Sequence, residues 1–274
     1  MINLLKIEWL KIKNYTAFKV MGLFFVAGVL LANYVVYMFN KNIVQETGAN
    51  MLLGSFKPYS FESTWQTTSY TSGFLLLLPA MLIIMLLTNE FSFRTNRQNV
   101  IDGWSRHEFI SVKLVMALII AVCSTVLVSA TALGFGLGSH SDFSYNGFSH
   151  IGYFFLKALT YNLFAVLISV LVKKTGFAIG LFFIYIGAEN FVSQMLNVLS
   201  MKIKMENKTD FGSIGNYLPM NAADGLLTFP ENPMKSMADK AFPTDYVYLI
   251  AAFAIAYIIL FILWSRNKYM TMDL

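Results

Sequence analysis

The stretch from Leu87 to Leu114 holds the side chains best suited to recognising another molecule. It is the most polar segment lying between two long apolar runs. The stretch carries four basic residues, Arg94, Arg97, Arg106 and Lys113, and three acidic ones, Glu90, Asp102 and Glu108. The guanidinium group of an arginine presents forked N–H donors that match a carboxylate. The chemistry that these residues predict is recognition by charge, with the stretch acting as the contact for a soluble protein partner.

The local sequence predicts how this stretch is shaped. Ser105 and Glu108 have the spacing of a capping box, in which each residue accepts a hydrogen bond from the backbone N–H of the other. A helix should therefore start at Ser105 and run on into the membrane. Asp102 and Gly103 just before it form a turn or helix-stop signal. We expect a short surface helix, a turn and then a capped membrane helix.

Lys157 and Glu189 form a second candidate set, because they are the two charged residues placed centrally within long apolar runs. Such residues usually face the interior of a helix bundle. The two runs are consecutive and should form antiparallel neighbours, so we expect an intramembrane ion pair between Lys157 and Glu189. Two alternatives stay open: Lys157 extends alone to the outer surface, or the charges act directly on a substrate or proton.

The sequence contains none of the motifs that would give the chain catalysis of its own. There is no G-x-x-x-x-G-K-[ST] phosphate-binding loop, no H-E-x-x-H zinc motif and no G-x-S-x-G nucleophile elbow. Cys123 is the single cysteine, and His140, Asp142 and His150 are scattered through one polar loop, which is weak evidence for a metal site. We expect no enzyme activity, no cofactor and no metal on this chain.

Membrane helices must position these side chains, because the composition is that of a membrane protein. Of the 274 residues, 57% are apolar and only 13% are charged, against about 25% charged in soluble domains, and the mean hydropathy is +0.59. Apolar runs long enough to cross a bilayer recur. They predict an all-α fold with six transmembrane helices at roughly Val20–Phe39, Tyr70–Thr88, Phe109–Gly138, Ile151–Val172, Thr175–Leu199 and Tyr246–Trp264.

The remaining segments are predicted to be partly helical. Residues 1–14 combine an apolar stripe with three lysines, which favours an interfacial helix on an anionic leaflet; a plain extension of the first span is the alternative. Residues 200–245 contain four prolines but are too apolar for a disordered tail, so we expect short helices that dip into or cap the outer membrane face. With no internal repeat or linker, residues 1–274 are predicted to form one domain.

The distribution of Lys and Arg predicts the orientation. Six spans place both termini on one side of the membrane. If that side is cytoplasmic, its short loops and ends carry most of the basic residues, as the positive-inside rule requires. The net charge of +5 is thereby assigned to membrane orientation, and nucleic acid is not expected as a partner.

Three local sequences, at residues 7–13, 90–106 and 217–222, resemble segments of the ABC-2-type permease subunits of ATP-binding cassette transporters. Residues 7–13 (IEWLKIK) resemble the opening of many small members of that family, and residues 217–222 (YLPMNA) resemble its segment before the last span. The most specific match is EFSFRTNRQNVIDGWSR at residues 90–106, which resembles the family's segment between spans two and three. The resemblance covers essentially the whole chain.

The resemblance implies half of a dimeric export pathway in the bacterial cytoplasmic membrane. A second permease subunit, identical or homologous, would complete it, and a separate ATPase subunit would bind ATP and Mg²⁺. The segment at about 89–104 would be a coupling helix seated in a cleft of the ATPase. By the family pattern, six residues would line or support that contact: Glu90, Arg94, Thr95, Arg97, Asp102 and Arg106.

Two other functions compete with an exporter permease. An ion-coupled carrier or channel usually shows inverted repeats and several polar residues at mid-membrane, and neither is clear here. A membrane assembly subunit without a transport path shares every feature except a usable cavity. The sequence identifies no substrate.

Overall fold

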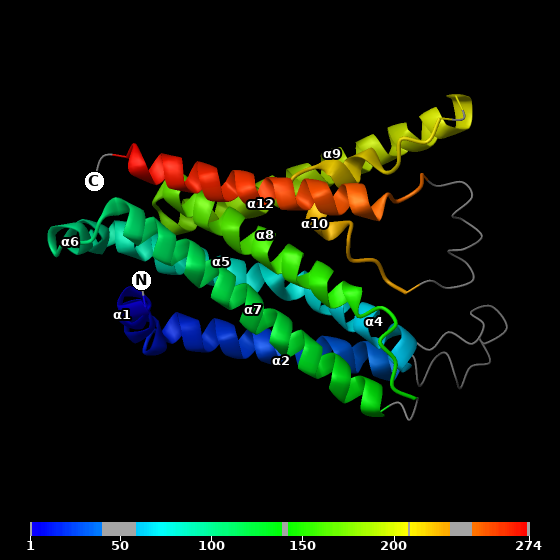
Figure 1. The fold of residues 1–274 in the computed structure, drawn as a ribbon, viewed down its shortest axis with the longest axis horizontal. Helices are drawn as coiled ribbons and strands as arrows, with labels where there is room; N and C mark the ends of the chain where they lie inside the picture. The colour runs from blue at the N-terminus through cyan, green and yellow to red at the C-terminus, as the bar shows by residue number, and fades with distance from the viewer. Residues whose placement is uncertain (1, 40–58, 139–141, 208, 231–242, 273–274) are drawn as a thin grey trace.

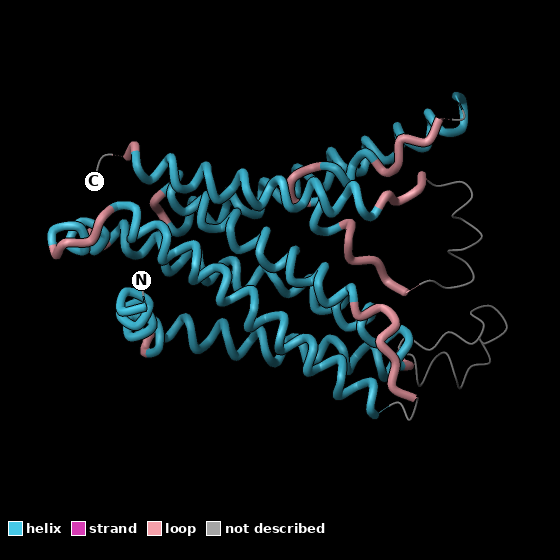
Figure 2. The backbone as a smooth tube through the Cα atoms, in the orientation of Figure 1, coloured by secondary structure: helices cyan, strands magenta, loops and turns pink. Residues whose placement is uncertain are grey.

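The structure is a computed structural model that describes residues 2–39, 59–138, 142–207, 209–230 and 243–272, all of whose regular elements are helices (Figure 2). Six of these helices, counting α4 to α5 as one, are long and apolar enough to cross a membrane. The elements in chain order are α1 (Ile2–Lys13), α2 (Thr16–Phe39), α4 (Phe61–Gly73), η2 (Phe74–Leu76), α5 (Leu77–Ser92), α6 (Thr95–Ile101), α7 (Arg106–Gly138), α8 (Ser149–Val172), α9 (Thr175–Asn207), η3 (Ile214–Tyr217), α10 (Asn221–Asp224) and α12 (Val247–Met270).

The spans run roughly alongside one another, and the start of α1, the end of α12 and the helix α6 all lie at one end of the bundle (Figure 1). We call this the α6 end. The segment holding η3 and α10 lies toward the opposite end, between α9, α8 and α12 (Figure 1). The expectation of an all-α protein with six membrane-spanning helices is confirmed.

The second span is longer than predicted and contains a short irregular turn. It runs from Ser63 to Ser92, and the 3₁₀ turn η2 separates α4 from α5. Pro79 explains the turn, because it has no N–H to donate to the carbonyl of Leu75 four residues earlier. Neighbouring helices compensate for such interruptions inside membrane bundles.

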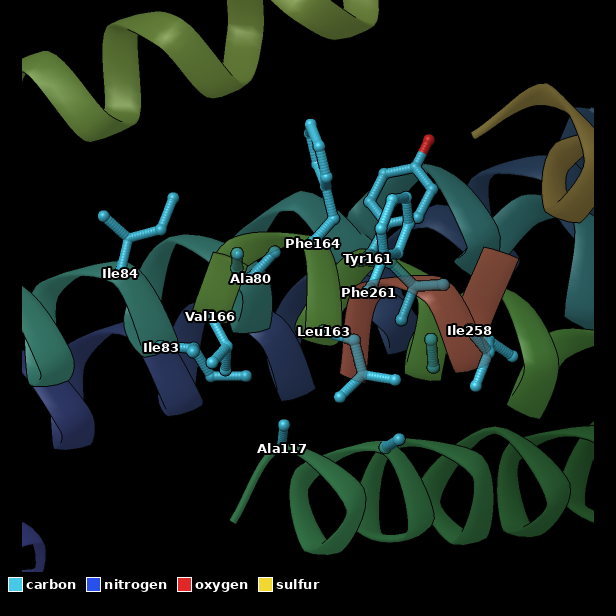
Figure 3. Packing of buried hydrophobic residues seen from close by; sticks show 14 of the residues in the cluster. Ala80, Ile83, Ile84, Ala117, Tyr161, Leu163, Phe164, Val166, Ile258 and Phe261 are labelled. Carbon is cyan, nitrogen blue, oxygen red and sulfur yellow. The ribbon is translucent and has the colours of Figure 1, made fainter. Parts of the chain in front are cut away.

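The helix α8 is the most buried of the spans and forms the centre of the core. Its small and aliphatic residues pack against α7 on one side and against α5 and α12 on others. Figure 3 shows Leu163 and Val166 of α8 extending toward Ala117 of α7, with Ile83 of α5 beside Val166. By contrast, α2 and α9 expose many large apolar side chains, as helices that face lipid do.

The first helix stands apart from the spans. In Figure 1 α1 is seen nearly end-on while α2 runs along the page, so the two helices cross at a steep angle. A short break at Asn14 and Tyr15 separates them. The alternative of a plain helical extension of the first span is therefore wrong, and the angle is the one that an interfacial helix needs.

Candidate functional site

The α5–α6–α7 hairpin at the α6 end has the local structure that its sequence predicts. Glu108 accepts a hydrogen bond from the backbone N–H of Ser105 at 2.9 Å, and Ser105 Oγ accepts from the N–H of Glu108 at 3.2 Å. This confirms the capping box at the start of α7. Gly103 turns the chain with φ of +102°, a conformation that glycine adopts without strain. Arg94 begins α6 in the left-handed region, at φ of 57°.

The outward surface of the hairpin combines basic and apolar side chains. Arg94, Arg97 and Gln98 are exposed, and so are two large apolar residues that flank them. Phe93 is 76% exposed and Ile101 is 83% exposed. We call these five residues the α6 face. Isolated exposed apolar residues are ordinary, but here two of them frame an arginine pair at the tip of a protruding hairpin.

Three of the six residues implied by the family pattern lie on this outward side, namely Arg94, Arg97 and Asp102. The other three bond within the chain. Thr95 Oγ1 donates to the carbonyl of Glu90 at 3.3 Å, and Arg106 donates to the carbonyls of Met270 and Met272 at 2.9 Å each. Arg106 thus fastens the end of α12 to the hairpin, where a cation also complements the partial negative charge of a helix C-terminus.

Glu90 points inward and joins a cluster of four charges that the sequence did not reveal. Lys113 Nζ donates to a carboxylate oxygen of Glu90 at 2.6 Å and makes a short contact with Glu8. Lys11 lies 2.9 Å from Glu8 and 3.6 Å from Glu90. This α1 cluster, Glu8, Lys11, Glu90 and Lys113, ties α1 to α5 and α7 immediately beside α6.

The cluster holds Glu8 in its charged form although that carboxylate is largely buried. Burial alone would raise the pKa of Glu8, but the charges and hydrogen bonds of Lys113 and Lys11 outweigh it and hold that pKa below its ordinary value. Burial would likewise lower the pKa of Lys11, and Glu90 and Glu8 reverse the shift. Lys11 also lies over the ring of Trp104, 5.6 Å from its centre, so α1 contacts the hairpin on both sides of α6.

The expected ion pair between Lys157 and Glu189 is wrong. Lys157 Nζ lies 3.2 Å from Asp224 at the end of α10, and Tyr161 OH donates to the same carboxylate at 3.0 Å. The partner of Lys157 therefore does not come from the consecutive span, as the sequence predicts. The segment before α12 instead folds back between α8 and α9 and brings Asp224 to Lys157.

Glu189 has a different role, since it accepts hydrogen bonds from the segment that contains η3 and α10. The backbone N–H groups of Met220 and Asn221 donate to it at 2.6 and 2.8 Å, and the Asn221 side chain donates at 3.1 Å. Farther along α9, Asn197 accepts from the N–H of Gly215 at 2.8 Å. The short helices predicted for this segment are confirmed.

A polar stripe on α9 supplies these acceptors. Glu189, Ser193, Asn197 and Ser200 are spaced by three or four residues, so they share one helix face. Ser200 Oγ accepts from the N–H of Ile214 at 3.2 Å. Irregular backbone at membrane depth needs such partners because no water replaces them. Residues 231–242 of the same predicted segment lie outside the described residues, as does His140 of the polar loop before α8.

An exchange of charges tests the observed pairing. We expect Lys157→Glu and Asp224→Lys each to lower the thermal stability of the purified protein, because each leaves a largely buried charge unpaired. The double variant should recover most of the loss. The matched control joins Lys157→Glu to Glu189→Lys and should recover nothing, because the acceptor for Met220 and Asn221 is removed. Recovery of stability in the control, and not in the first double variant, would indicate that Lys157 pairs with Glu189 instead of Asp224.

Comparison of the chain with protein-family models and with curated proteins found no match. The fold itself shows a membrane protein with six candidate spans in the described part of the chain. A more specific function must therefore be argued from the two ends of the bundle.

Proposed function

We propose that the chain is the membrane-spanning subunit of an ATP-driven exporter of the ABC-2 type, docking a separate ATPase through α6. The observation that carries the proposal is the α6 face. A short helix protrudes at one end of an apolar bundle and presents Arg94 and Arg97 between exposed Phe93 and Ile101. A small aromatic and aliphatic anchor with flanking arginines is the composition favoured at protein interfaces. The resemblance of residues 90–106 supports the same assignment.

The α1 cluster gives this docking helix a firm base. Its ion pairs connect α1 with α5 and α7, the helices that lead into and out of α6. Displacement of α6 by a partner would then move α1, α5 and α7 together rather than bend the hairpin alone. Such coupling can drive a conformational change of the spans only if ATP binds one state of the complex better than the other.

In this proposal the α6 end faces the cytoplasm of a bacterium, and both termini lie there. The helix α1, the start of α2 and the end of α12 lie toward that end (Figure 1). In sequence they carry Lys6, Lys13, Lys19, Arg266 and Lys268, in keeping with the positive-inside rule. A second permease subunit would cover part of the exposed apolar surface of the spans. ATP and Mg²⁺ would bind to the ATPase alone.

Charge reversal on the α6 face tests the docking. We expect Arg94→Glu combined with Arg97→Glu to lower co-purification with a Walker-motif ATPase from the native host at least about tenfold, since reversing charges at an interface leaves like charges opposed. The spans should remain folded, because both side chains are exposed and form no ion pair in the described structure. Thermal unfolding of the purified variant checks this.

The matched control reverses two exposed charges at the same end, Arg266→Glu and Lys268→Glu on α12, and should leave co-purification unchanged. Equal losses in both variants would mean that only net charge matters. Wild-type protein that never captures an ATPase would favour an ion-coupled carrier, or an assembly subunit if it also lacks transport. Labelling of Arg97→Cys by a reagent applied outside the cell would show that the α6 end faces outward and would contradict the proposed orientation.

A further inference from the structure

A cavity that lies beside α1 is almost wholly apolar. It has a volume of about 450 Å³, within the range of about 300–1,000 Å³ for sites that bind small molecules. Its walls come from four helices, α1, α2, α5 and α7, and include Leu5, Trp9, Phe25, Leu82 and Leu127. Trp9 and Phe18 meet edge to face across the junction of α1 and α2, 6.0 Å between ring centres.

The apolar lining of the cavity favours a hydrocarbon chain over a polar ligand. Ser124 is its one hydroxyl, and that Oγ already donates to the carbonyl of Ile120 at 2.8 Å. A polar or charged group in the cavity would therefore lose its hydration and find few partners, since the indole N–H of Trp9 and the thiol of Cys123 are the other polar groups of the lining. Val26, Ile119 and Cys123 line the cavity and are also exposed on the surface, so the cavity opens sideways between α2 and α7, toward the lipid.

The length of the cavity fits a chain inserted from one leaflet. The helix α1 lies at the level of Lys113, which contacts Glu8. The lining residue Leu127 lies about 21 Å farther along α7, from a rise of about 1.5 Å per residue. The hydrocarbon half of a bilayer is about 15 Å deep. An extended acyl chain whose head lies beside α1 therefore stays within the cavity for most of its length.

The charge beside the cavity identifies the head of that chain. Lys6 and Lys13 lie three residues before and four residues after Trp9, so all three share one face of α1. Both lysines are exposed, and neither forms an ion pair within the described residues, unlike Lys11 of the same helix. Paired ammonium groups at a membrane surface attract anionic lipid.

We propose that this cavity binds one acyl chain of an anionic phospholipid, with the lipid phosphate held between Lys6 and Lys13. The lipid would fill the space between α1 and the bundle and fix the position of the helix that carries Glu8 and Lys11. The inference rests on the cavity and the lysines and does not depend on the chain being an exporter.

Native mass spectrometry of the full-length protein tests this, after release from bilayers of equal phosphatidylglycerol and phosphatidylcholine. We expect one retained phosphatidylglycerol per chain. Gly22→Leu should reduce it at least about tenfold, because Gly22 lines the cavity and a Cβ added there would meet no atom within 4 Å. Gly187→Leu is the matched control: a Cβ added there has equally open space, on exposed α9, and retention should not change.

The lysines test the head group. Lys6→Gln with Lys13→Gln should lower the preference for phosphatidylglycerol over phosphatidylcholine about 25-fold, at about fivefold for each lysine. Cys123→Phe at the exposed mouth is a second blocking variant if Gly22→Leu does not accumulate. Equal retention in wild type and a folded blocking variant, no preference for the anionic lipid, or a retained molecule that is not a phospholipid would each overturn the proposal.

Discussion

Replacing Lys113 with Met should destabilise the protein by about 3–5 kcal/mol, the usual cost of removing one partner from a buried ion pair. The Lys113 side chain is only 8% exposed and contacts the carboxylates of Glu8 and Glu90. Its loss leaves two buried acids with Lys11 as their remaining cation. We expect a lower thermal unfolding midpoint of the purified protein and faster proteolysis at α1, which the cluster holds in place.

Lys11→Met is the control, because it removes a cation from the same cluster at a more exposed position. Its side chain is 36% exposed, so solvent screens the interaction and the expected cost is below about 1 kcal/mol. A variant that also carries Glu8→Gln and Glu90→Gln should regain much of the stability lost in Lys113→Met, since no buried carboxylate is then left unpaired and the remaining cation, Lys11, is 36% exposed. Equal effects of Lys11→Met and Lys113→Met would contradict the role given to burial.

The same cluster predicts how stability responds to acid. The pKa of Glu8 is lower in the folded protein than its ordinary value of 4.5. The stabilisation from its ionised form is therefore complete above pH of about 4.5 and is lost as the pH falls through the lower folded pKa. Wild-type protein should lose α1 attachment on acidification in this range. Glu8→Gln should remove that part of the pH dependence.

Much of the fold follows from the long apolar runs. A run of about 20 apolar residues crosses a bilayer as a helix, because a helix satisfies all of its backbone hydrogen bonds within the run. The first, third and fourth predicted spans begin within four residues of α2, α7 and α8 and share their last residues. The start of the second span does not follow from such a run, since α4 holds Thr64 and Thr67 where apolar residues are expected. Their hydroxyls donate to carbonyls four residues earlier, which lets a polar sequence be buried in a helix.

The hairpin could be predicted because its signals are local, whereas the partners of buried charges could not. Ser105 and Glu108 lie three residues apart, so the hydrogen bonds between them can be predicted from the sequence alone. Lys157 and Asp224 are brought together only by the fold of a segment before α12. Glu8 gives one usable signal: it is an acid in a helix otherwise charged only by lysines, a pattern that favours a cationic partner elsewhere.

Glu189→Leu should release the η3–α10 segment from α9. The carboxylate accepts three hydrogen bonds from Met220 and Asn221, and hydrogen bonds to a charged group contribute about 1.5–3 kcal/mol each. Losing even one of these without a replacement shifts the equilibrium between attached and released segment about tenfold or more. The buried Ala223 of α10 should then become accessible to reagents in water.

Thiol labelling measures this release directly. In a Cys123→Ala background, Ala223→Cys should react slowly with a membrane-impermeant maleimide, because Ala223 is fully buried. Adding Glu189→Leu should accelerate labelling at least about tenfold. Glu189→Gln keeps an acceptor oxygen of the same shape but not the charge, so it should accelerate labelling much less than Glu189→Leu. If Leu and Gln accelerate labelling equally, the negative charge rather than the backbone hydrogen bonds holds the segment, and Glu189 would have to be reassigned to electrostatic partners such as Lys157.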